Sequence, residues 1–146
     1  MGYYSDVRLT LSKKGYKKLR KYVDEEAKKV ATPGYDCNLL NHTDIFKVKH
    51  IKDNTEFLIG WNYIKWYESR ELGWYDDIRI IINGLKQLRD DRLSYHFSRI
   101  GEDLTDIDED YWDDDEDPID SYIYIERHFN DDDFEGEDYK EGGINI

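Results

Sequence analysis

The chain has 146 residues, with 34 acidic against 21 basic side chains and a formal net charge of −13. This length suits one domain with an ordinary core and leaves too little chain for a second full domain. The single cysteine excludes an internal disulfide, and no apolar run approaches the roughly 20 residues of a membrane span. We therefore expect a soluble protein of the cytoplasm.

The first elements are a strand and a helix. Residues 6–11 alternate polar and apolar side chains, which predicts a half-buried strand with its apolar positions, from Val7 to Leu11, facing inward. Ser12 is a typical N-cap for a basic helix over residues 13–31, which the turn residues at 32–34 end. The apolar positions of this helix share one face at spacings of three and four: Tyr16, Leu19, Val23, Ala27 and Val30.

The middle of the chain predicts a hairpin, a second helix and a further strand. Residues 44–51 and 55–67 are strand-like runs close enough in sequence to pair antiparallel. A helix is expected over residues 74–91 and a strand over 93–100. The buried stripe of the second helix is expected to contain Ile78, Ile81, Ile82, Leu85 and Leu88. The resulting order, strand, helix, strand, strand, helix, strand, predicts an α+β fold of the ferredoxin-like βαββαβ type.

The C-terminal third adds a strand, an acidic connection and a tail to these expectations. Residues 121–129 alternate in character and predict an additional antiparallel strand. We therefore expect one α+β domain over residues 1–130, with a long acidic connection between two strands at residues 101–120. Residues 131–146 are rich in Asp, Glu and Gly, and predict an acidic, flexible tail.

The charge is concentrated in that C-terminal third. Residues 1–100 hold 19 basic and 14 acidic side chains, a balance of +5, whereas residues 101–146 hold 2 and 20, a balance of −18. Between positions 102 and 120 there are twelve carboxylates and no Lys or Arg. A balanced body followed by an anionic block favours an interaction surface for a cationic partner.

We expect this acidic connection to be anchored to the body by Ile107, Tyr111 and Trp112. In extended chain, alternate aspartates such as Asp106 and Asp108 lie about 6.6 Å apart on one face, and DNA carries one charge per about 3.4 Å along each strand. Anchored aspartates could therefore occupy a groove built for phosphates. The expected partner-binding residues are Asp103, Asp106, Asp108, Glu109, Asp110, Trp112, Asp113, Asp114, Asp115, Glu116 and Asp117.

Other interpretations of the same residues stay open. The block could be a solvated loop without a partner, which most charge runs are. A calcium loop starting at Asp106 has Tyr111 in place of the required glycine, so we expect no metal site there. His96 and His128 lie on strands expected to be close, but neither belongs to a catalytic or zinc motif. The aromatic strand over residues 57–67 is either core or a contact patch. No cofactor is expected.

Several segments resemble small proteins of phages and prophages of low-GC bacteria. They are GYYSDV at residues 2–7, KGY at 14–16, and RIGED at 99–103 leading into DIDE at 106–109. A small, strongly acidic, cysteine-poor protein of this kind resembles the anti-CRISPR and anti-restriction inhibitors, several groups of which are DNA mimics. The resemblance implies an inhibitor that places carboxylates where a nucleic-acid channel holds phosphates. The basic helix over residues 13–31 departs from that pattern.

The resulting hypothesis is a non-enzymatic phage inhibitor whose acidic loop binds the basic cleft of a host defence nuclease, either a CRISPR effector or a restriction enzyme. Such a protein would act in the cytoplasm of the bacterial host, without binding DNA or membranes itself. The alternative is a protein- or RNA-binding module that uses the aromatic strand 57–67 and the basic helix 13–31, with the acidic loop only as a solubiliser. The basic helix and the acidic loop could also pair, either within one molecule or between two copies in a homodimer.

Overall fold

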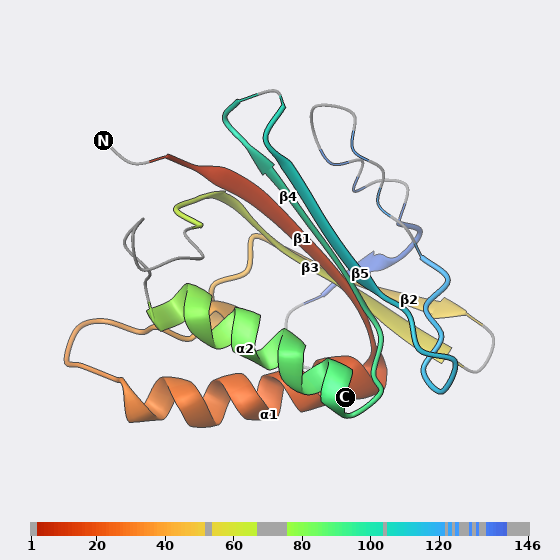
Figure 1. Ribbon diagram of the computed structural model, residues 1–146, viewed down its shortest axis with the longest axis horizontal. Coiled ribbons are helices and arrows are strands. Elements are labelled where there is room, and N and C mark those ends of the chain that lie inside the picture. Colours follow the sequence, from red (N-terminus) through yellow and green to blue (C-terminus); the bar gives the residue numbers. More distant parts are fainter. Residues whose placement is uncertain are drawn as a thin grey trace.

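In the part of the chain that the structure describes, two α-helices and a six-stranded antiparallel sheet make up the fold (Figure 1). The computed structural model describes residues 3–51, 54–66, 76–103, 105–121, 123, 125, 129, 131 and 134–139. In chain order the elements are β1 Ser5–Ser12, α1 Lys13–Lys29, the 3-10 turn η1 Leu39–Asn41, β2 Ile45–Ile51, β3 Asn54–Ile64, α2 Asp76–Asp90, β4 Tyr95–Gly101, β5 Ile107–Trp112 and β6 Glu137–Asp138.

The strands lie in the order β5-β4-β1-β3-β2-β6. The four central strands, β4-β1-β3-β2, come from two interleaved β-α-β units, which is the ferredoxin-like arrangement predicted from the element order. Neighbouring strands are antiparallel in every pair. The predicted α+β fold with an additional strand is therefore confirmed. β5 and β6 extend this core at its two edges.

Local sequence accounts for the two helices. The Ser12 hydroxyl accepts the Gly15 amide at 3.0 Å and so caps the start of α1. Lys28 and Lys29 occupy the last turn of α1, where cations interact favourably with the helix dipole. Asp76 and Asp77 lie in the first turn of α2, where anions interact favourably with the opposite end of the dipole. α1 ends two residues before its predicted end, and residues 74–75 of the predicted second helix lie outside the described part.

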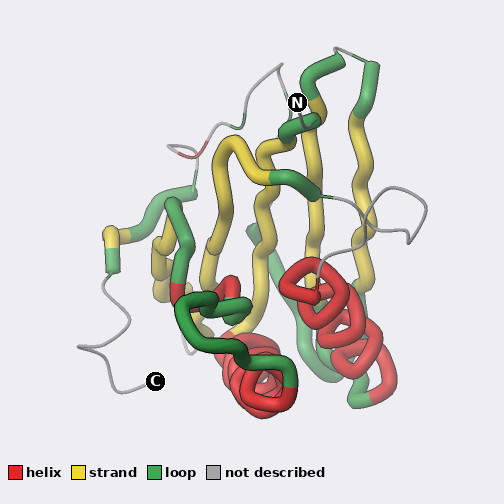
Figure 2. The backbone as a smooth tube through the Cα atoms, turned by 90° about the vertical axis from the view of Figure 1, so that its left-hand side faces the viewer, coloured by secondary structure: helices red, strands yellow, loops and turns green. Residues whose placement is uncertain are grey.

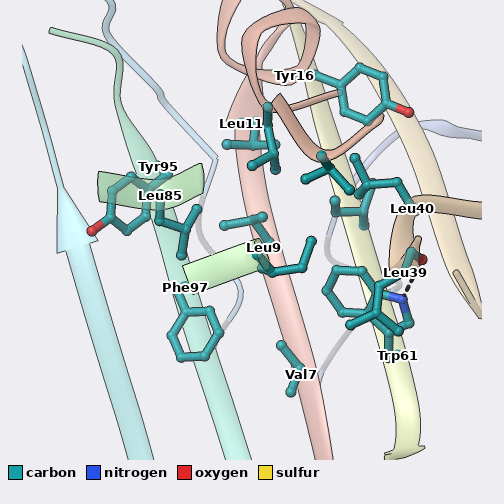
Figure 3. Close-up of a cluster of buried hydrophobic side chains, with 14 of the residues drawn as sticks. Val7, Leu9, Leu11, Tyr16, Leu39, Leu40, Trp61, Leu85, Tyr95 and Phe97 are labelled. Carbon is teal, nitrogen blue, oxygen red and sulfur yellow. Dashed lines mark hydrogen bonds between the residues drawn. The ribbon is translucent and has the colours of Figure 1, made fainter. Parts of the chain in front are cut away.

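Both helices cover the same face of the sheet, as Figures 1 and 2 show. Val7, Leu9 and Leu11 of β1 project into this core and are fully buried, as the alternation predicted (Figure 3). The Trp61 indole donates to the Leu39 carbonyl at 2.9 Å, so this large side chain is buried with its polar atom satisfied. The two helices approach so closely that a Cβ on Gly84 would collide with Leu19.

The opposite face of the sheet is covered by the C-terminal third of the chain. Ile123, Phe129 and Phe134 pack there against Leu58 of β3 and Ile100 of β4. As a result, alternate polar side chains of the central strands are also buried, among them Arg8, Thr10, His96 and Ser98. Figure 1 shows the helices on one side of the sheet and the blue C-terminal residues on the other.

One expectation about this third is wrong, and another lies largely outside the described residues. The additional strand next to the core is β5. Most of the predicted strand over residues 121–129 is not described, and within its described residues Ile125 and Phe129 form an isolated bridge. The expectation of a flexible tail is wrong for Asp131 and residues 134–139. Phe134 is buried, and β6 pairs with β2. The physical reason is that the apolar side chains of this acidic segment can be buried only against the second face of the sheet.

Candidate functional site

The acidic block contains a strand with a turn on either side. We call residues 102–120 the acidic edge, because β5, at its centre, is an edge strand of the sheet. β5 pairs with β4 from Tyr95 opposite Trp112 to Ile100 opposite Ile107, without a register shift. The centre of the acidic connection, which was expected as a loop, is therefore a regular strand. This β-strand also replaces the calcium loop considered for the same residues, which would have to wrap around an ion.

A tight turn between β4 and β5 fixes the first carboxylates of the acidic edge. The Gly101 amide donates to the Asp106 carbonyl at 2.8 Å, and the Asp106 amide donates to the Asp103 carbonyl at 3.0 Å. The Tyr3 hydroxyl donates to Asp106 Oδ2 at 2.8 Å and accepts the Asp103 amide at 2.9 Å. A Cβ at position 101 would collide with both Asp106 and Tyr3, so glycine permits this closure.

Arg99 of β4 holds two of the predicted site residues. Its guanidinium donates to Asp106 at 2.6 and 3.0 Å and to Asp108 at 2.6 and 3.0 Å. Arg99 is buried, and it also donates to Ser5 Oγ at 3.0 Å. The hydrogen bonds from Arg99 lower the pKa of Asp106, with a further contribution from Tyr3, and together they outweigh the opposing effect of burial. Asp106 and Asp108 thus share one cation on one face.

Arg89 of α2 holds the third aspartate of that face. Its Nη2 donates to Asp110 Oδ2 at 2.6 Å, and the Tyr95 hydroxyl donates to the same oxygen at 2.7 Å. Burial, followed by the hydrogen bond to Asp110, raises the pKa of Tyr95, so the phenol stays protonated as a donor. The Arg89 guanidinium also lies over the Trp112 ring, 5.6 Å from its centroid. The alternate aspartates are therefore aligned as predicted, and it is Arg89 and Arg99 that hold their side chains in place.

The turn after β5 has an exposed part and a buried part. Arg92 donates to Asp114 at 3.2 Å and to Glu116 at 3.1 Å on the exposed side. Asp117 is only 7% exposed and accepts the Ser12 hydroxyl at 2.8 Å and the Ser94 amide at 2.9 Å. Asp117 is therefore a structural carboxylate, which removes it from the predicted partner-binding set.

The expected anchors are only partly those observed. Tyr111 stacks on His96 with ring centroids 4.6 Å apart, whereas Ile107 and Trp112 are 42% and 38% exposed. Buried side chains after the strand, Asp117 and Ile119, attach the segment instead. His96 itself contacts Asp113 at 2.7 Å, and His128 lies outside the described residues. For the Ile119 anchor, the available signal in the sequence was an isolated apolar residue within an acidic stretch.

The arginines position the acidic edge without neutralising it. Arg89, Arg92 and Arg99 are the arginines that pair with it in the described part of the chain, against twelve carboxylates in the sequence. Glu109, Asp115 and Asp120 are exposed and make no side-chain hydrogen bond or ion pair with any described residue. An excess of negative charge therefore remains on this surface. In the sequence these three arginines stand out only as part of the positive balance of residues 1–100.

A cleft of about 320 Å³ runs between α2 and β5. Its floor is apolar, and one wall carries cations of α2 while the other carries carboxylates of β5. The lining residues are Ile82, Leu85, Lys86, Arg89, Tyr95, Phe97, Asp108, Glu109 and Asp110. The cleft thus opens directly beside the acidic edge.

The basic helix does not neutralise the acidic edge. Lys18 pairs with Asp91 at 3.0 Å and Lys29 with Glu26 at 2.7 Å. The other lysines of α1 are exposed and form no ion pair within the described residues: Lys13, Lys14, Lys17, Lys21 and Lys28. Lys13 and Lys14 line one pocket together with Glu116 and Asp117, so the start of this cationic helix face lies beside the acidic edge, with no ion pair between them.

The aromatic strand is mostly core. Phe57, Trp61 and Trp66 are buried, and the ring centroids of Trp61 and Trp66 lie 5.8 Å apart. Tyr63 is 71% exposed, but its ring stacks on Tyr4 at 4.0 Å. Tyr67, and the later aromatics Trp74 and Tyr75, lie outside the described residues. The described members of this strand offer little of the contact patch that the alternative function needs.

Comparison with protein-family models, with curated proteins and with solved structures gave no significant match. Among the described residues, no group of three or more His, Cys, Asp or Glu side chains is arranged to hold a metal ion. In the same part of the chain, no helix is long and apolar enough to cross a membrane.

Proposed function

We propose that this protein is a non-enzymatic, phage-encoded inhibitor of a host defence nuclease, with a CRISPR effector as the first class of target to test. In this proposal the acidic edge occupies a basic nucleic-acid-binding cleft as a DNA mimic. The observation that carries the proposal is the acidic edge itself, whose carboxylates are held by β-pairing and arginines while a negative excess remains.

Fixed carboxylates suit this function better than a flexible acidic chain. A mobile segment loses conformational entropy when a partner immobilises it, at about 0.5 to 1.5 kcal/mol for each rotamer-rich side chain. Asp106, Asp108 and Asp110 already have their rotamers restrained by Arg99 and Arg89. A cationic cleft therefore meets charges that need little further ordering, and the remaining excess charge speeds the encounter.

The first experiment captures partners from bacterial lysate on the immobilised protein at low and high salt, with identification by mass spectrometry. We expect a basic nucleic-acid-binding nuclease that is released as salt rises, because exposed charges are screened within about 8 to 10 Å at physiological ionic strength. The captured nuclease is then tested for DNA binding and cleavage with the purified protein added. Capture of no nucleic-acid-binding protein contradicts the proposal.

Two matched triple variants locate the activity. Glu109→Gln, Asp115→Asn and Asp120→Asn together remove three charges from the acidic edge without removing a side-chain hydrogen bond or ion pair to a described residue. Glu135→Gln, Glu137→Gln and Asp138→Asn remove the same charge from exposed positions at the other edge of the sheet. We expect the first triple to weaken inhibition at least tenfold more than the second. Equal effects would mean that total charge, and not this edge, governs binding.

A second function is favoured by one observation, the exposed lysines of α1. A cationic helix face of this kind can bind an anionic partner such as RNA through phosphate contacts. The aromatic half of that alternative has little support, since Phe57, Trp61 and Trp66 are core residues. The lysine face thus stands as a separate candidate surface with its own test.

A further inference from the structure

The outer side of β5 is an unused sheet edge. β5 is the terminal strand and pairs only with β4 in the described part of the chain. Its six residues contain no proline or glycine, and its ladder has no bulge. Regular edge strands present alternate backbone N–H and C=O groups that can pair with another strand. The backbone geometry for strand addition is therefore present.

The side chains of β5 decide which strand could add there. A second copy pairing antiparallel would bring Asp108, Glu109 and Asp110 opposite carboxylates of the same three positions, which is unfavourable. A strand that carries Lys or Arg at those positions gains instead, because opposite charges face each other across the pair. Charge thus excludes self-association at this edge and selects a basic segment.

The ends of β5 and the neighbouring cleft further restrict which strand could add there. Ile107 and Trp112 flank the three acids and are two of the four exposed large hydrophobic side chains in the described residues. An added strand would lie about 4.8 Å beyond β5. Long side chains on its α2-facing side could lean back over the cleft, whose floor includes Phe97 and Tyr95. Apolar stems with cationic heads fit such a site.

We propose that the partner contributes an extended basic segment, which adds to β5 as a further antiparallel strand. In this arrangement two or three Lys or Arg side chains face Asp108, Glu109 and Asp110, and apolar side chains face Ile107 and Trp112. This inference rests on the proposed function, since it specifies how the acidic edge engages a basic protein.

The test uses a fluorescent peptide probe with the core sequence Val-Thr-Lys-Arg-Lys-Val and the full-length protein, with binding followed by fluorescence anisotropy. A second peptide carries N-methyl groups on the alternate amides that would face β5, so its charge and side chains are unchanged while its pairing donors are lost. We expect N-methylation to weaken binding at least tenfold. A third peptide with Glu in place of the three basic residues should not bind.

One protein variant locates the peptide. Glu109→Lys reverses a charge on β5, and Glu135→Lys makes the same change at an exposed site away from it. Only the first should abolish peptide binding, with both variants equally folded by circular dichroism. Equal binding of the plain and N-methylated peptides overturns strand addition, as does failure of both to bind. If the triple variant of the acidic edge still loses inhibition in either case, the proposed function stands without strand addition.

Discussion

Arg8 and Asp131 form an ion pair across 123 positions of sequence, with Arg8 Nε donating to Asp131 Oδ1 at 2.8 Å. Arg8 lies on β1 at the centre of the sheet and is 5% exposed, and its guanidinium stacks over Phe129 at 4.8 Å. Its second contact, from Nη2 to Asp131 Oδ2, is 3.1 Å long. The C-terminal third is thus bonded to the centre of the domain.

Asp131→Ala should lower the free energy of unfolding by about 2 to 3 kcal/mol. This lies at or below the low end of the range for a broken buried ion pair, because the Asp131 side chain retains 20% exposure. Urea denaturation measures the change. Asp138→Ala, at an exposed site on β6, is the control and should shift the midpoint little. Equal stability of the two variants would mean that Arg8 gains nothing from Asp131.

Deleting residues 131–146 should therefore destabilise the protein, and any loss of inhibition would follow from lost folding. If residues 131–146 were the flexible tail expected from the sequence, this deletion would instead leave inhibition nearly intact. The deletion also removes Phe134, which is 2% exposed. Thermal unfolding of the deletion variant checks the result, and an unchanged midpoint would restore the flexible-tail interpretation.

Acid should weaken the turn between β4 and β5. Arg99 lowers the pKa of Asp106, so this carboxylate contributes stability above its unfolded pKa of about 3.9, and the contribution is lost as pH falls through the lower folded pKa. Asp106→Asn should be clearly less stable than the parent protein near neutral pH. The difference should shrink below about pH 4. Denaturation series across this range measure it, and a difference independent of pH would rule out Asp106 ionisation as its source.

Glu56 should control the attachment of the segment after the acidic edge. It is 1% exposed, and its two carboxylate oxygens accept the Ser121 and Asp120 amides, each at 3.0 Å. Glu56→Leu should lower the free energy of unfolding by about 2 to 4 kcal/mol, because two backbone donors lose their acceptors. Glu56→Gln, which keeps one oxygen, should cost less. Hydrogen exchange at the two amides reports the change, and unaltered exchange in Glu56→Leu would contradict this role.

The lysine face of α1 should be dispensable for the proposed inhibition. Lys14, Lys17, Lys21 and Lys28 are exposed and form no ion pair in the described chain, so replacing all four by Gln should change stability little. Capture of the nuclease should persist. Loss of capture, or loss of binding to a single-stranded RNA probe that the parent protein binds, would favour the lysine face as the functional surface.

Local sequence patterns predicted both helices and four of the strands well, namely β1, α1, β2, β3, α2 and β4. These patterns depend only on residues close together in the chain. Examples are the strand alternation around Val7 and Leu9 and the helical spacing around Leu19 and Leu85. Their order then limited the fold to two interleaved β-α-β units. The concentration of carboxylates at residues 102–120 was likewise evident from composition.

Only the tertiary structure decided what covers the second face of the sheet. Alternation showed that Arg8 and His96 lie opposite the core positions, but it carries no information on whether distant chain will bury that face. Their partners, Asp131 and Asp113, come from the C-terminal third. The same holds for β5, since the three acids at its centre have low strand propensity, and pairing with β4 and the contacts of Arg99 override it. Such contacts depend on which segments the folded chain brings together, and local patterns do not record that.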